Sequence, residues 1–76
     1  MEDRKAILYE LGKCLRAYRE AKGVSQEEVS FSAGIHRTYL SQIELGERNP
    51  SFIVLIKICE VLGVAPSELI AEALKK

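Results

Sequence analysis

The chain has 76 residues, of which 47% are hydrophobic, so residues 1–76 can fold as one small domain with a modest core and are not expected to be disordered. The formal net charge is 0, which argues against a simple, strongly basic DNA-binding protein. No apolar run approaches the roughly 20 residues of a membrane span, and the start MEDRKAIL lacks the apolar stretch of a signal peptide. We therefore expect no membrane contact and a cytoplasmic location.

The pattern of apolar residues predicts five helices and no strand, and the first helix covers residues 3–22. Its apolar side chains recur at i, i+3, i+7 and i+10, a spacing that places them on one helix face. Gly23 follows as a stop signal at the C-terminal end. The residues of this stripe are Leu8, Leu11, Leu15 and Tyr18.

The next two predicted helices are short and close together, over residues 25–33 and 36–45. Ser25 opens the first of them, and Glu28 three residues later completes the pattern of a capping box. Gly34 lies in the tight turn between the two helices. Two short helices joined in this way predict a helix-turn-helix, whose second helix can lie in the major groove of DNA.

The last two predicted helices begin after Ser51 and at Pro66, a residue that suits the first turn of a helix. The first of them ends at Gly63. Five of its residues are expected on the inner face: Phe52, Leu55, Ile58, Cys59 and Leu62. The connections between helices are only a few residues long, as a compact helical domain requires.

Positive charge is unevenly distributed along this neutral chain. Residues 13–22 contain four cations and one acid, Glu20, and Arg37 and Arg48 add two cations around the third predicted helix. A basic face of this kind is sufficient for contact with phosphate, although the same cations would also form an ordinary solvated surface.

The sequence gives no sign of catalysis or of a bound cofactor. It has one His, no glycine-rich phosphate loop and no paired carboxylates in a plausible pocket, so we expect neither an enzyme nor a cofactor. Cys14 and Cys59 have no CxxC partner and no nearby His cluster, so we expect no metal site. Both fall on apolar helix faces and are interpreted as small hydrophobic residues, with a redox switch between them as the alternative.

Several short segments resemble one family. The segments 23–28 (GVSQEE), 33–35 (AGI), 43–46 (IELG) and 62–64 (LGV) are similar to the helix starts, turn and helix ends of the phage Cro/repressor family of helix-turn-helix domains, also called the XRE family. The similarity covers residues from about 11 to 74. It implies an all-α, five-helix, lambda-repressor-like DNA-binding domain.

A more specific resemblance lies in residues 36–50. The run HRTYLS at 36–41, followed by Glu44, Gly46, Arg48, Asn49 and Pro50, resembles the controller proteins of restriction–modification systems. Those are small homodimeric regulators that activate or repress their own operon. The resemblance implies double-stranded DNA with a pseudo-palindromic operator as the partner, a homodimer, and RNA polymerase as a further candidate partner.

The resemblance also assigns roles to individual positions. Arg19 and Glu44 match a structural ion pair between the first helix and the end of the third. Arg37 is the best candidate for a bidentate contact with guanine. The predicted base-contacting residues are Arg37, Thr38, Tyr39, Ser41 and Gln42. The predicted phosphate-contacting residues are Gln26, Ser25, His36, Arg16, Lys22, Arg48 and Asn49.

The fourth predicted helix has more apolar residues than one core face needs. A leftover apolar patch on so small a domain indicates an interface, although some of these residues would serve to close the core. We therefore predict dimerisation through the last two helices. The predicted interface residues are Ile53, Val54, Ile56, Ile70 and Leu74.

A different function remains open for the same fold, namely a protein-interaction module of the antitoxin or coactivator type. Such a module would use the domain mainly to hold a partner protein. The sequence shows no tail beyond the five predicted helices, so we expect sequence-specific DNA binding and transcriptional regulation rather than this alternative.

Overall fold

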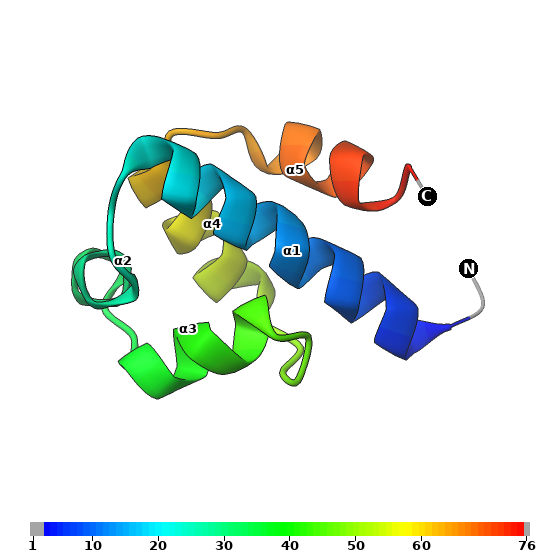
Figure 1. Ribbon diagram of the computed structural model, residues 1–76, viewed down its shortest axis with the longest axis horizontal. Coiled ribbons are helices and arrows are strands. Elements are labelled where there is room, and N and C mark those ends of the chain that lie inside the picture. The colour runs from blue at the N-terminus through cyan, green and yellow to red at the C-terminus, as the bar shows by residue number, and fades with distance from the viewer. Residues whose placement is uncertain (1–2, 76) are drawn as a thin grey trace.

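The computed structural model describes residues 3–75, and within that range it contains five helices and no strand (Figure 1). The all-α class predicted from the sequence is confirmed, and the predicted helix ends agree with the observed ones to within a residue or two. The helices are α1 (Arg4–Lys22), α2 (Gln26–Ala33), α3 (Arg37–Glu44), α4 (Phe52–Leu62) and α5 (Pro66–Ala73).

Local side-chain chemistry explains where α2 and α4 begin. The hydroxyl of Ser25 accepts a hydrogen bond from the backbone N–H of Glu28 at 3.0 Å, and the Glu28 carboxylate accepts one from the N–H of Ser25 at 2.8 Å. The predicted capping box is thus formed. Ser51 caps α4 by accepting from the N–H of Val54 at 3.1 Å. His36 precedes α3 without a capping hydrogen bond from its side chain.

The turn between α2 and α3 depends on a left-handed backbone conformation. Gly34 has a φ of +73°, which a residue without a side chain adopts at little cost. The N–H of Gly34 donates to the carbonyl of Phe31 at 3.2 Å, and the N–H of Ile35 donates to Ser30 at 2.9 Å. These bonds satisfy the last carbonyls of α2 and fix the direction in which α3 leaves it.

The helices enclose one core. In Figure 1, α1 crosses the middle of the molecule, with α5 along one side and α3 along the other, while α2 lies at one end. Besides its contact with α3, α2 packs against α4. The completely or almost completely buried side chains are Leu15, Val29, Leu40, Ile43, Ile58, Cys59 and Leu69.

Close approach of α1 to the end of α3 requires a glycine to which the sequence analysis assigned no role. A Cβ atom at Gly12 would lie 2.5 Å from the carbonyl oxygens of Ile43 and Glu44. Real Cβ atoms do not approach backbone this closely. Gly12 therefore allows α1 to rest directly on the last turn of α3.

One predicted core position is wrong. Phe52 was expected on the inner face of α4, but 71% of it is exposed. Leu55, Ile58 and Leu62 on the same stripe are buried as predicted. Phe52 is the first residue of α4, and the Cα–Cβ bonds of a helix tilt toward its N-terminus, so this ring projects past the start of the helix and beyond the core.

The two cysteines lie in different environments. Cys59 is completely buried in the core, which agrees with its interpretation as a small hydrophobic residue, and burial raises the pKa of its thiol. Cys14 is only half-buried, beside α5. None of the helices within residues 3–75 is both long enough and apolar enough to cross a membrane.

Candidate nucleic-acid interface

A buried carboxylate connects the end of α3 to α1. Glu44 accepts hydrogen bonds from Nε of Arg19 at 2.7 Å and from Nη2 of Arg19 at 3.1 Å. Only 3% of the Glu44 side chain and 13% of the Arg19 side chain are exposed. The remaining terminal nitrogen of Arg19 donates to the carbonyl of Val24 at 3.0 Å. The ion pair predicted from the resemblance is therefore formed, and the hydrogen bond to Glu44 raises the pKa of Arg19.

The same carboxylate also holds the first residue of α2. Nε2 of Gln26 donates to Glu44 at 2.9 Å. Gln26 is a predicted phosphate contact, and no sequence pattern predicts its bond to Glu44. A side-chain amide nitrogen carries two hydrogens, so one remains for a ligand. The bond to Glu44 therefore holds Gln26 in one orientation and still leaves it a donor for phosphate.

Four of the predicted DNA-contacting residues gather around one open depression of about 470 Å³, which we call the arginine depression. It lies between α1 and the starts of α2 and α3, and its lining residues are Arg16, Arg19, Ser25, Gln26, Glu27 and Arg37. Two of its three arginines are already paired, Arg19 with Glu44 and Arg16 with Glu20. Arg37 is exposed and forms no ion pair with any residue in the described part of the chain, so its donors are available to a ligand.

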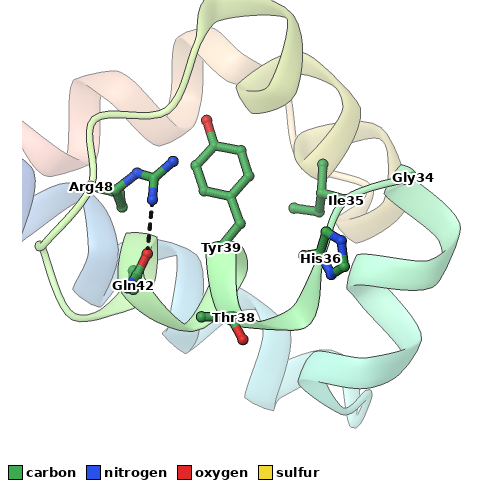
Figure 2. Close-up of a pocket in the computed structure, with 7 residues that line it drawn as sticks. All are labelled: Gly34, Ile35, His36, Thr38, Tyr39, Gln42 and Arg48. Atoms are coloured by element: carbon green, nitrogen blue, oxygen red, sulfur yellow. Dashed lines mark hydrogen bonds between the residues drawn. The ribbon is translucent and has the colours of Figure 1, made fainter.

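A second depression, of about 670 Å³, lies on the other side of α3 and is called here the α3 depression (Figure 2). Five predicted contact residues line it together with Gly34 and Ile35: His36, Thr38, Tyr39, Gln42 and Arg48. In Figure 2 the exposed Thr38 points away from the other labelled side chains, whereas Tyr39, Gln42 and Arg48 converge.

The convergent side chains of the α3 depression form a network that the sequence analysis missed. Nη1 of Arg48 donates to Oε1 of Gln42 at 3.1 Å, and the guanidinium lies over the ring of Tyr39 at 4.8 Å from its centroid. The hydroxyl of Tyr39 accepts from the N–H of Ser51 at 3.4 Å. No sequence signal specifies this network, because Arg48 reaches back to α3 only through the path of the loop after that helix.

Three predicted contact residues lie outside both depressions. Ser41 is half-buried on α3, and Asn49 is exposed in the loop that follows it. Lys22 lines a different depression, together with Phe31 and Val61. Its Nζ atom would lie 3.9 Å from a Cβ atom added at Gly63. Their contacts with DNA remain predictions.

The predicted dimer residues differ in exposure. Ile53, Leu74 and Ile70 are 60%, 48% and 39% exposed, so they present apolar surface to solvent. Val54 and Ile56 are half-buried, and Val54 packs against the core. Val54 therefore serves partly to close the core, which is the alternative that the sequence left open.

Chemically, the surface around α3 is rich in hydrogen-bond donors. Guanidinium, amide and hydroxyl groups suit both phosphate oxygens and the edges of bases in the major groove. Within residues 3–75 there is no group of three or more His, Cys, Asp or Glu side chains that could hold a metal ion.

The chain is similar to known helix-turn-helix proteins. A family model described as helix-turn-helix matches residues 15–69. A protein of Sinorhizobium fredii named uncharacterized HTH-type transcriptional regulator y4dJ is 39% identical over 70 residues, which cover 92% of this chain and 86% of the relative. Control protein C.BamHI of Bacillus amyloliquefaciens is 43% identical over 60 residues, 78% of this chain and 74% of the relative.

A solved structure gives the same picture. The restriction–modification controller protein C.AhdI from Aeromonas hydrophila matches with a TM-score of 0.79 and 40% sequence identity. The match covers 82% of this chain and 94% of that chain. The likeness therefore extends over most of both molecules.

Proposed function

We propose that this chain, which belongs to the XRE-type helix-turn-helix family, is a homodimeric controller of a restriction–modification operon that includes its own gene. Its relatives are regulators of transcription and not enzymes, and this chain is likewise a DNA-binding transcriptional regulator. The restriction–modification context is supported by the likeness to C.BamHI and C.AhdI. We expect it to act in the cytoplasm on promoter DNA, with RNA polymerase as the further partner.

The observation that carries the proposal is the position of α3 between two depressions lined with donors. Arg37 and Thr38 are exposed at its N-terminal end, the part of a recognition helix that contacts base edges. The buried pair of Arg19 and Glu44 anchors the opposite end of α3 to α1. A helix held in this way can enter the major groove as a rigid element.

We propose that contacts with phosphate flank α3. Ser25 and Gln26 lie at the start of α2, where unpaired backbone N–H groups and the positive end of the helix dipole favour an anion. Arg16 lines the same arginine depression from α1, and His36 and Asn49 are exposed on either side of α3. These contacts would fix the register of α3 without reading sequence themselves.

The homodimer is supported by the apolar side chains that α4 and α5 expose. Pairing about a two-fold axis would bury the same patch on both chains and take Ile53, Ile70 and Leu74 out of water. Two copies of α3 about 34 Å apart would then require a pseudo-palindromic operator.

A gel shift on the DNA upstream of the chain's own gene tests the proposal. We expect a shifted complex that survives an excess of random duplex and weakens steeply as salt rises, because binding releases counterions from the phosphates. Binding to the upstream DNA no tighter than to random duplex would contradict sequence-specific regulation. An adjacent methyltransferase gene and endonuclease gene would support the controller role.

A module that holds a partner protein is the second candidate. Phe31 on α2 favours it, because this ring is 87% exposed and a protein interface would cover it. Such a module would bind its partner without a salt-sensitive complex on upstream DNA. The gel shift therefore separates the two functions.

A further inference from the structure

We propose that Arg48 is a positioning residue that orients the amide of Gln42 so that the α3 surface selects guanine and rejects adenine at one base of each half-site. This inference rests on the proposed function, because it requires α3 to lie in the major groove. It concerns which base is read, and no other part of the proposed function depends on it.

The geometry fixes which end of the amide faces outward. Arg48 has only donors, so the group of Gln42 that faces it at 3.1 Å must be the carbonyl oxygen, as Figure 2 shows. The amide nitrogen of Gln42 forms no hydrogen bond with the residues that the structure describes. Gln42 therefore offers N–H groups to a ligand, while its acceptor is already engaged.

The guanidinium that imposes this orientation is itself held in place. It stacks over the ring of Tyr39 at 4.8 Å from the centroid, and the Tyr39 hydroxyl is bound to the N–H of Ser51 at the start of α4. A planar guanidinium on an aromatic face keeps its direction better than a flexible ammonium would. The orientation of Gln42 is therefore set by side chains on α3 and by the loop that follows it.

Base chemistry turns this orientation into a preference. A glutamine reads adenine by accepting from N6 and donating to N7, which needs both ends of its amide. Here an adenine amino group would meet the N–H groups of Arg48, donor against donor. Guanine instead presents two acceptors, O6 and N7, which match the outward N–H groups of Gln42.

Selection from a random duplex library, followed by sequencing, tests the inference. The wild type and Gln42→Ala are compared first, and the base at which the preference disappears is the one that Gln42 reads. We expect the wild type to favour guanine there over adenine by about tenfold. Arg48→Ala should release the oxygen of Gln42 and move the preference at that base to adenine. Circular dichroism checks that each variant is folded.

Arg4→Ala is the matched control, since it removes the same type of cation from the exposed first residue of α1 and should leave the guanine preference intact. Selection of adenine or thymine by the wild type at the Gln42 base would overturn the inference. So would an unchanged preference in Arg48→Ala. A library from which the wild type enriches no motif would instead overturn the proposed function, and this inference with it.

Discussion

Glu44 at the end of α3 and Arg19 on α1 form two hydrogen bonds, at 2.7 and 3.1 Å, in a site almost closed to solvent. Gln26 adds a third bond to the same carboxylate from the start of α2. One side chain thus fastens the proposed recognition helix to the two helices that approach it. The fold and the presentation of α3 consequently depend on the same contact.

Removal of this carboxylate should destabilise the protein strongly. We expect Glu44→Ala to lower the free energy of unfolding by about 3–5 kcal/mol, because Arg19 would keep its charge in a buried site without a partner. Urea denaturation measures the change. The matched control is Glu20→Ala, which breaks the exposed pair with Arg16 and should cost less than about 1 kcal/mol. Similar losses in the two variants would contradict the account.

A Gly12→Ala substitution distinguishes the effect of close packing between α1 and α3 from the effect of helix propensity. An alanine in the interior of an exposed helix is more favourable than a glycine by about 0.5–1 kcal/mol. At position 12, however, the added carbon would press on the carbonyl oxygens of Ile43 and Glu44, so we expect Gly12→Ala to destabilise by about 1–3 kcal/mol. Thermal or urea unfolding gives the sign, and a more stable variant would disprove the close contact between α1 and α3.

Dimerisation should depend on the exposed side chains of α4 and α5. Ile53→Glu places a charge at a site that is 60% exposed in the single chain, so the fold should remain helical while the dimer weakens at least about tenfold. Sedimentation measures the dimer population. Phe31→Glu makes the same kind of change outside the predicted interface and should leave the dimer intact. A wild-type protein that stays monomeric at tens of micromolar would contradict the predicted dimerisation.

Alkaline pH should destabilise the protein partly through Cys59. Burial raises the pKa of this thiol in the folded chain, so its contribution to stability is present below the ordinary thiol pKa and is lost as pH rises through the raised value. We expect the free energy of unfolding to fall more steeply in alkaline solution for the wild type than for Cys59→Ala. If the free energy of unfolding fell equally steeply with pH in the two proteins, the loss of stability would not come from the Cys59 thiol.

The helix pattern was predictable because local signals determine it. Ser25 with Glu28, Gly34 in the turn and Ser51 before α4 act through hydrogen bonds and backbone angles over three or four residues. Phe52 was misplaced because periodicity gives the face of a helix but not how far the core extends along it. Where the core ends depends on the other helices, which the pattern does not describe.

The candidate site was predictable in part for a similar reason. The pairing of Arg19 with Glu44 followed from the resemblance, and the structure contains it. The bond from Gln26 to Glu44 and the stacking of Arg48 on Tyr39 did not follow, because they join side chains from different elements at distances that only the packing sets. Gly12 gave no signal either, since a helical glycine can be a tolerated exception or a required close contact.

Arg37 is exposed, lies at the start of α3 and forms no ion pair with any described residue. The proposed reading of DNA sequence by α3 depends most directly on a base contact from this arginine. The most direct measurement is a fluorescence anisotropy titration of the wild type and Arg37→Ala on the operator and on a random duplex at one salt concentration. We expect the variant to lose about 1–3 kcal/mol of binding free energy on the operator and much less on random DNA. Equal losses on the two duplexes would show that Arg37 contacts only phosphate and would contradict the account.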